Sequence, residues 1–477
     1  MRLKHITTIA LSIFTALSFA QQYNIEASSQ YEKGHPNEVH HIAFQTAYGF
    51  STYGYLDNVF MDNTKEITIT KYDQELKAFD TYKFNLPKLG NRAADLLKVI
   101  ELENKLVFIS KSMDKAKAAH EVYAQVYNNE TGVVEDTKTL ASIAIEKLSK
   151  SGFFQVSISP DNTKIGILAN LPFVKKTKEK IKVWVYDSNL NELWKANHTL
   201  EFDSERAYDE TLLVSNSTEA FILKKQDYHK KTATAHLLKI NSSTIDVSLI
   251  SKSDFKPRDV KLISTGINDV LLGFYWDGKK PAVQMNTTPG DDTQGVFMYD
   301  LDSNKITAQH KWNAQGNTND LKSLKIVDTK VFADDIYILG EKQLTDSEFK
   351  PNSTELKYSH TFGPAILINL NVDGTLKKMN FIFDSKVFQD EQKEKGSFYM
   401  LETVDGLRLF YNKNSFTISS YYAEDKVTYP TLSAKRPSGS TLYPHLIPHS
   451  VTPVSNHNMI YFISKYDSNY WFHRVTW

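Results

Sequence analysis

The alternation of apolar and polar runs is clearest between Gly152 and Leu200, and this stretch is a template for the rest of the chain. Its apolar runs are rich in Val, Ile and aromatic residues, which favours strands over helices. The turn SPDN162 combines a proline that presets the backbone with an asparagine that tolerates a positive φ. The stretch therefore predicts one four-stranded antiparallel unit, with strands at Phe153–Ser159, Thr163–Asn170, Ile181–Tyr186 and Glu192–Leu200.

The third strand of this unit, IKVWVY186, is apolar on both faces. Ile181, Val183 and Val185 share one face, and Trp184 and Tyr186 share the other. A sheet with one solvated face would alternate with polar residues, so we expect this sheet to be covered on both sides.

The same third strand recurs as an apolar run that ends in an aromatic or aliphatic residue, and in most copies a turn rich in Asp or Asn follows. A pair of shorter apolar runs, joined by a polar turn, precedes most copies. Four-stranded units repeated every 50 to 70 residues or so are typical of a β-propeller. We therefore predict an all-β fold, a seven- or eight-bladed β-propeller of four-stranded antiparallel blades. The copies are ITITKY72, VYAQVY127, KVWVY186, AHLLKI240, VFMY299, AILINL370 and FTISSYY422, with YWFHRV475 as an eighth candidate.

The two ends of the chain are expected to meet. The sequence stops on the eighth candidate strand, so the segment Tyr23 to Tyr31 is predicted to supply the missing strand of the last blade. Such pairing would remove an open sheet edge. Helical periodicity is scarce, and Leu140 to Lys150 is the one segment for which we predict a short helix.

One hairpin carries a family resemblance. SISPDNTKIGIL168 resembles the S-P-D-G hairpin of the WD40-like repeats in TolB-type propellers, with Asn162 in place of the usual glycine. The resemblance implies a propeller and no particular activity. Some families with such repeats add a serine hydrolase domain, but this sequence has no Gly-x-Ser-x-Gly elbow.

The first twenty residues are typical of a secretory signal, which leaves residues 21–477 as a single propeller domain. Arg2 and Lys4 precede the apolar run Ile6 to Phe19, and small residues near Ala20 suit cleavage there. No later run is long enough for a transmembrane segment. The chain has no cysteine, which excludes disulfides and favours a bacterial envelope protein over a eukaryotic secreted one. We expect a periplasmic or secreted bacterial protein.

Charge and motif patterns exclude several functions. The chain has 56 basic and 56 acidic residues, and such a balance does not suggest nucleic-acid binding. We expect no cofactor and no metal. Asn369 to Gly374 resembles the start of a calcium loop but has no closing glutamate, so we interpret it as a hairpin turn. The remaining metal candidates are four histidines that ring closure would bring near one another: His40, His41, His445 and His449.

The binding surface is expected on the face that carries the loops between the second and third strands of each blade. These loops are long at Leu171–Lys180, Asp277–Gln294 and Gln343–Gly363, and long loops on a rigid scaffold concentrate ligand contacts. The predicted ligand-binding residues are Trp276, Asp277, Lys279, Asp291, Asp292, Asp346, Glu348, Tyr358, His360 and Arg206.

No catalytic motif is present, so the sequence favours a binding or interaction scaffold for a protein or carbohydrate ligand in the cell envelope. A carbohydrate-active or peptide-cleaving enzyme on the same face is the alternative, and a structural subunit whose partner covers an apolar rim is a third. We expect a monomer. A pair of buried carboxylates at the mouth of the central opening would favour the enzyme.

Overall fold

The computed structural model describes most of the chain. The described residues are 24–28, 31–32, 38–56, 65–102, 104–148, 150–204, 209–226, 234–252, 254–276, 293–312, 324–349, 356–382, 386–389, 396–403, 406–413, 416–421, 426–428, 434–435, 441–442, 445–454, 457–466 and 469–476. The predicted signal segment, residues 1–20, lies outside them.

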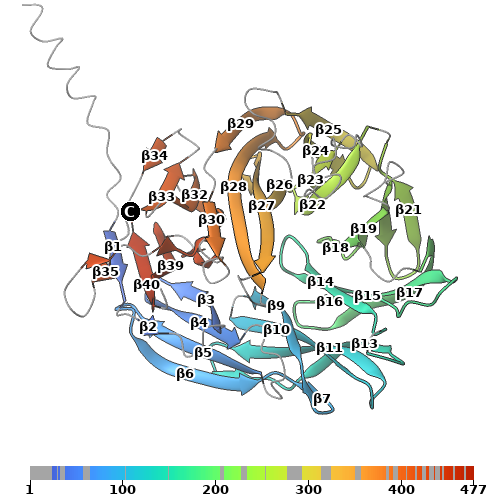
Figure 1. The fold of residues 1–477 in the computed structure, drawn as a ribbon, viewed down its shortest axis with the longest axis horizontal. Helices are drawn as coiled ribbons and strands as arrows, with labels where there is room; N and C mark the ends of the chain where they lie inside the picture. Colours follow the sequence, from blue (N-terminus) through green and yellow to red (C-terminus); the bar gives the residue numbers. More distant parts are fainter. Residues whose placement is uncertain are drawn as a thin grey trace, which may run out of the picture.

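The described residues form eight antiparallel sheets of four to six strands, arranged in a ring (Figure 1). We call these sheets blades 1 to 8 in chain order. Blade 1 contains β3 (Glu38–Thr46), β4 (Gly49–Leu56), β5 (Glu66–Asp73) and β6 (Ala78–Asn85). Blade 2 contains β9 (Asp95–Leu102), β10 (Lys105–Asp114), β11 (Ala119–Asn128), β12 (Val133–Val134) and β13 (Lys138–Ala144). Blade 3 contains β14 (Phe153–Ile158), β15 (Lys164–Asn170), β16 (Lys178–Asp187) and β17 (Glu192–Asp203). Blade 4 contains β18 (Asp209–Val214), β19 (Ala220–Gln226), β20 (Thr234–Ile240) and β21 (Ile245–Leu249).

The second half of the ring repeats this plan with two elaborations. Blade 5 contains β22 (Lys256–Ser264), β23 (Asp269–Trp276), β24 (Gly295–Asp300) and β25 (Lys305–Lys311). Blade 6 contains β26 (Leu324–Phe332), β27 (Asp335–Phe349), β28 (Leu356–Asn371), β29 (Leu376–Ile382) and β30 (Lys386–Gln389). Blade 7 contains β31 (Tyr399–Thr403), β32 (Gly406–Lys413), β33 (Phe416–Tyr421) and β34 (Lys426–Thr428). Blade 8 contains β37 (His445–Leu446), β38 (Thr452–Pro453), β39 (Met459–Tyr466), β40 (Asn469–Thr476), β1 (Asn24–Ala27) and β2 (Tyr31–Glu32).

Three small elements complete the described structure. Two are two-stranded ribbons and one is a single 3-10 turn near the start of blade 8. They are β7 (Lys88–Leu89) with β8 (Arg92–Ala93), β35 (Ala434–Lys435) with β36 (Thr441–Leu442), and η3 (Pro448–Ser450).

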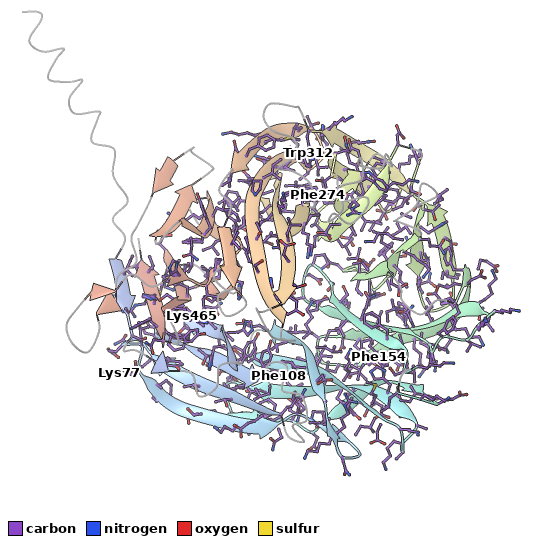
Figure 2. The ribbon with its side chains drawn as sticks, in the orientation of Figure 1. Lys77, Phe108, Phe154, Phe274, Trp312 and Lys465 are labelled. Carbon is purple, nitrogen blue, oxygen red and sulfur yellow. The ribbon has the colours of Figure 1, made fainter. Side chains whose placement is uncertain are left out.

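The core lies between the blades. Eight hydrophobic clusters each draw their side chains from two neighbouring blades, and the series closes where blade 8 packs on blade 1. At the junction of blades 5 and 6, the rings of Phe274 and Trp312 meet edge to face, with centroids 5.8 Å apart (Figure 2). Every blade is therefore apolar on both faces, as a propeller requires.

The third strand of blade 3 shows the predicted two-sided burial. Val183 and Val185 pack against blade 4, whereas Trp184 and Tyr186 pack against blade 2. The strands of this blade also lie where the sequence predicts them, and Asn162 adopts a positive φ of 58° in the first turn. The chain is a β-propeller, and the sequence predicted the four strands of blade 3.

The ring is closed by the N-terminal segment, as predicted. β1 pairs antiparallel with β40, with Asn24 opposite Thr476 and Ala27 opposite His473. β2 pairs with the start of the same strand, where Tyr31 lies opposite Tyr470. The eighth candidate strand is therefore real, and blade 8 is built from both ends of the chain.

Two predictions were wrong. The helix predicted for Leu140 to Lys150 is wrong, because Lys138–Ala144 is strand β13, which pairs with β11 from Lys138 opposite Ala124 to Ala144 opposite Ala119. The segment Gln343 to Gly363 is not simply a long loop. β27 and β28 continue in register through it as a protruding hairpin, from Gln343 opposite Phe362 to Phe349 opposite Leu356. Short-range pairing between strands thus overrides the local pattern in both segments.

Two further findings concern turns and membranes. The segment Asn369 to Gly374 does form a hairpin turn between β28 and β29, in which the Gly374 amide donates to the Asn371 carbonyl at 2.9 Å. Within the described ranges, no helix has the length and apolar character needed to cross a membrane.

Candidate functional site

The first strand of each blade lies nearest the axis of the ring. β9, β14, β18 and β22 surround its middle in Figure 1, and the first strands of several neighbouring blades contact one another. Polar side chains on these strands also join the blades. The Phe44 amide donates to Glu101 Oε1 at 2.8 Å, and the Ile326 amide donates to Asp259 Oδ2 at 2.6 Å. The axis is therefore lined by strands whose positions are well determined by their neighbours.

Four titratable side chains occupy one level of these strands. Lys98 lies four positions before the end of β9, and Lys261 lies three positions before the end of β22. Asp328 and Tyr399 lie four positions before the ends of β26 and β31. Because each residue of a strand advances the chain by about 3.3 Å, the four residues differ in height by about one residue. Glu101 and Lys330 lie slightly nearer the turns, and we call these six residues the axial cluster.

Members of the cluster act on one another across the ring. Lys98 is in blade 2 and Lys261 is in blade 5, yet the charge of Lys261 helps to lower the pKa of Lys98. Glu101 of blade 2 and Asp328 of blade 6 both help to raise the pKa of Tyr399 in blade 7. Blades 2 and 5 are separated by two intervening blades, so these charges act on each other across the axis.

The axis is accessible to water but only partly hydrated. Lys98, Glu101 and Lys261 are exposed, and Asp328 and Tyr399 are half-buried. The surrounding protein nevertheless removes enough water to lower the pKa of Lys98 and to raise those of Glu101 and Asp328. Side chains that are exposed to water and yet partly desolvated by surrounding protein line an opening and not an outer surface.

The charges of the cluster are unequally compensated. Asp328 Oδ2 lies 3.8 Å from Lys330 Nζ, and Glu101 accepts the Phe44 amide. These interactions oppose the desolvation that raises the two carboxyl pKa values. Among the described residues, no carboxylate lies within ion-pair distance of Lys98 or Lys261. The arrangement can therefore hold a polar ligand, with ammonium and phenol groups free to donate.

A second charged group is sealed between blades 3 and 4. Lys224 Nζ lies 2.8 Å from Glu179 Oε2 and 3.4 Å from Glu210 Oε2, and all three side chains are at most 3% exposed. Asn170 Nδ2 donates to the other oxygen of Glu179 at 3.1 Å. Burial raises the pKa of Glu179, and the Lys224 charge opposes that change. This triad is a structural link between blades, because a ligand has no access to it.

The structure describes four of the side chains predicted for the long-loop face, and they lie in two different places. Trp276 is 2% exposed at the end of β23 and packs into the cluster between blades 4 and 5. Asp346, Tyr358 and His360 lie on the protruding hairpin of β27 and β28. His360 is buried, with Nδ1 3.0 Å from Thr345 Oγ1, whereas Tyr358 is 37% exposed. Asp346 is exposed.

Alternation along β28 decides which of these residues share a face. Tyr358 and His360 are two positions apart and point to the same side. Asp346 pairs with the intervening Ser359, so it lies on the other side of the hairpin. Glu348 is in β27, but its side chain lies outside the description. The remaining predicted residues lie outside the described residues: Asp277, Lys279, Asp291, Asp292 and Arg206.

Of the four histidines near the ring closure, His449 acts on His41, which follows His40 in β3. Burial, together with the charges of His449 and His40, lowers the pKa of His41 to about 4. The His41 ring stacks on Tyr53, with centroids 4.9 Å apart. In the described part of the chain, no group of three His, Cys, Asp or Glu side chains is arranged to hold a metal ion.

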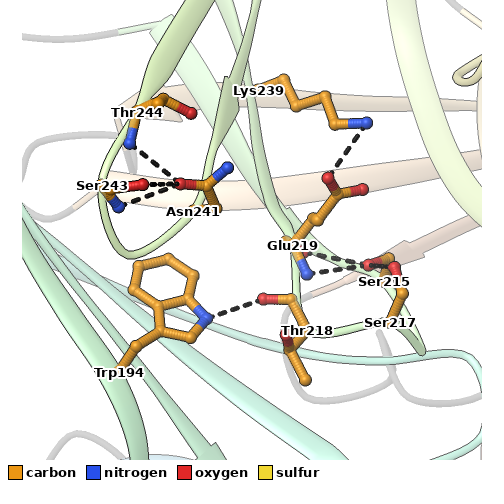
Figure 3. Close-up of polar contacts among 9 residues, drawn as sticks. All are labelled: Trp194, Ser215, Ser217, Thr218, Glu219, Lys239, Asn241, Ser243 and Thr244. Carbon is orange, nitrogen blue, oxygen red and sulfur yellow. Dashed lines mark hydrogen bonds and ion pairs between the residues drawn. The ribbon is translucent and has the colours of Figure 1, made fainter.

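A shallow cavity of about 320 Å³ lies on the opposite face, between blades 4 and 5, and includes Glu219, Asn268 and Asp269 in its lining. Figure 3 shows its neighbourhood. Trp194 Nε1 donates to the Thr218 carbonyl at 2.9 Å, and Glu219 pairs with Lys239 at 3.0 Å. These contacts are those of well-ordered hairpin turns. The axial cluster, which draws on four blades, is the better candidate for a site.

The sequence prediction missed the axial cluster, although a signal for it exists. Lys98 interrupts the apolar run LLKVIEL102, and Lys261 and Asp328 interrupt comparable runs. Charged residues inside an otherwise apolar strand are more informative than exposed ones in loops. Alignment of the predicted units on their first turns would have placed these residues in nearly the same column.

The fold and this arrangement define a β-propeller with a polar cluster on its axis. No family model matches the sequence, and no curated protein matches it. Solved structures similar to this chain include the WD40 domain of SCAP from fission yeast, at 10% identity and a TM-score of 0.40, over 95% of this chain and 98% of that one. The β-propeller domain of the Trilobed protease from Pyrococcus furiosus gives 11% identity and a TM-score of 0.35, over 76% and 96%. Polysaccharide lyase Uly1 gives 11% and 0.35, over 80% and 89%. Likenesses this weak carry no argument about function.

Proposed function

We propose that this protein is a binding scaffold of the bacterial cell envelope that holds a protein or carbohydrate ligand at the axis of the propeller. The observation that supports it most directly is the convergence of Lys98, Lys261, Asp328 and Tyr399 at one level of an accessible axis. Four rigid blades contribute to this cluster. The long-loop face, including Asp346 and Tyr358, forms the rim of the same site in this proposal.

The envelope location is part of the proposal and rests on the sequence. The charged and apolar pattern of residues 1–20 is typical of an export signal, and the chain has no cysteine. Export predicts a mature chain that begins at Gln21. N-terminal sequencing of the protein purified from its native cells tests this, and an intact Met1 would contradict export.

Affinity capture with matched variants tests the proposed site. The immobilised protein is incubated with an envelope extract, and retained glycans and peptides are identified by mass spectrometry. We expect a component that the unaltered protein retains and that a Lys98→Met, Tyr399→Phe double variant loses. Because Asp246 is an exposed residue of the outer strand β21, away from the axis, Asp246→Asn is the matched control and should retain the component. Equal retention by all variants would contradict an axial site.

One observation favours the alternative, an enzyme that cleaves a carbohydrate or a peptide. Glu101 and Asp328 both have raised pKa values, and both act on Tyr399. A carboxyl group with a raised pKa is suited to general acid catalysis. The same capture experiment separates the two functions. An enzyme would release its component in cleaved form, and Glu101→Gln would restore the intact component.

A further inference from the structure

The axial cluster presents more donors than acceptors to a ligand. Lys98 of β9 and Lys261 of β22 lie at nearly one level of the strands that surround the axis (Figure 1), and no described carboxylate lies within ion-pair distance of either. The nearby carboxylates are engaged, Asp328 by Lys330 and Glu101 by the Phe44 amide. The phenol of Tyr399 stays protonated well above neutral pH because burial raises its pKa. Two ammonium groups and one hydroxyl therefore remain to donate.

We infer that Lys98, Lys261 and Tyr399 form a receptor for an oxyanion, a carboxylate or phosphate group carried by a polar ligand. This inference rests on the proposed function, since it specifies the ligand chemistry of the same site. An oxyanion between the two lysines would remove their mutual repulsion and form charge-assisted hydrogen bonds in partly dehydrated surroundings.

The acidic members of the cluster limit the charge of the ligand. The charge of Asp328 interacts with that of Lys261, so the positive potential at the axis is reduced on the blade 6 side. A group with one negative charge satisfies Lys98 and Lys261 without strong repulsion from Asp328. We therefore expect a singly charged carboxylate to bind more tightly than a doubly charged phosphate.

Competitive amine labelling of the mature protein tests the receptor directly. A trace of acetic anhydride is added near pH 7.5, and acetylation of each lysine is followed by mass spectrometry. Lys98 should react faster than the exposed Lys305, because a lowered pKa leaves more of its amine neutral. Inorganic phosphate or glucuronate should slow the labelling of Lys98 and Lys261 several-fold. Glucose, and sodium chloride at equal ionic strength, should not.

Variants supply the matched controls. Lys261→Met should weaken the protection of Lys98 by about tenfold or more, as expected when a charge-assisted hydrogen bond is lost. Lys305→Met should leave protection unchanged, because Lys305 is in the outer strand β25. Asp328→Asn should strengthen protection. Glucuronate, with one negative charge, should protect at lower concentration than phosphate, which is mostly doubly charged at this pH. The reverse order would contradict the limit that Asp328 sets on ligand charge.

The outcomes separate this inference from the proposed function. If neither anion protects Lys98 through the millimolar range, or if chloride protects equally well, the receptor does not exist. An uncharged component captured through Lys98 and Tyr399 would then leave the binding scaffold intact and overturn only its anion chemistry. If no anion protects Lys98 and the capture of every component is the same for all variants, both proposals are overturned.

Discussion

At the scale of single residues, burial decides how much an ion pair contributes. Lys224 and Lys239 lie on the adjacent strands β19 and β20 of blade 4, and each pairs with glutamate. Lys224 is 3% exposed and holds two buried carboxylates, whereas Lys239 is 29% exposed and holds one. Water can replace the partner of Glu219 but cannot reach Glu179. The two lysines therefore have different roles despite similar geometry.

Lys224→Met should destabilise the protein by about 3–5 kcal/mol, because it leaves Glu179 and Glu210 buried without their cation. Lys239→Met is the matched control and should cost about 1 kcal/mol or less. Urea unfolding at pH 7 measures both changes. Equal losses for the two variants would show that the triad contributes no more than an exposed pair.

The pH dependence of the Lys224→Met variant follows from Glu179. Burial already raises the pKa of this carboxyl group, and removal of Lys224 should raise it further. A carboxyl whose folded pKa is raised costs stability as pH increases from the unfolded pKa through the folded one. The destabilisation by Lys224→Met should therefore be smallest near pH 4 and grow toward pH 7.

At the scale of elements, the blades are packed so closely that a small residue is required at one junction. Gly166 in β15 faces Val214 in β18, and an added Cβ would lie 2.2 Å from Val214 Cγ2. Gly166 has no positive φ, so space and not backbone conformation requires glycine here. The contact lies where blades 3 and 4 converge toward the axis.

Gly166→Ala should therefore cost about 1–3 kcal/mol through overpacking between blades 3 and 4. The double variant with Val214→Ala should be more stable than the sum of the two single changes predicts, because the smaller side chain makes room for the new methyl group. Urea unfolding of the four proteins gives the coupling free energy. Simple additivity would mean that the blades separate to accommodate the alanine.

At the scale of the whole molecule, one short segment closes the ring. β1 pairs with β40 along four residues, and Ile25 packs against the cluster between blades 7 and 8. Arg474 of β40 also forms an ion pair with Glu26. Without this segment, β40 would present an open sheet edge at the point where the first and last blades meet.

Deletion of residues 21–32 should lower the thermal unfolding midpoint by roughly 5–10 °C, since it removes a paired strand and part of a core cluster. Deletion of residues 21–23 alone, which leaves β1 intact, is the matched control and should have little effect. Calorimetry measures both midpoints. An unchanged midpoint after the longer deletion would mean that strand pairing between the termini does not stabilise the ring.

Local patterns were sufficient to predict much of this architecture. The two apolar faces of IKVWVY186 predicted contacts with two neighbours, and Val183 and Trp184 do pack on different blades. The same reasoning failed at Leu140 to Lys150 and at Gln343 to Gly363. At Leu140 to Lys150 a partner strand elsewhere in the blade supplies the hydrogen bonds, and at Gln343 to Gly363 the two halves of the segment pair with each other. A pattern read along the chain contains no information about either pairing.

The sequence by itself determined the repeating strands, the burial of both faces of each blade and the pairing of the two ends, because these follow from periodicity and strand length. Only the tertiary structure decided which polar residues meet. Lys98 and Lys261 are 163 positions apart in the sequence, and they interact because ring closure brings their strands to one axis. Periodicity places a residue within its own blade, but the distance between residues of opposite blades depends on how many blades close the ring.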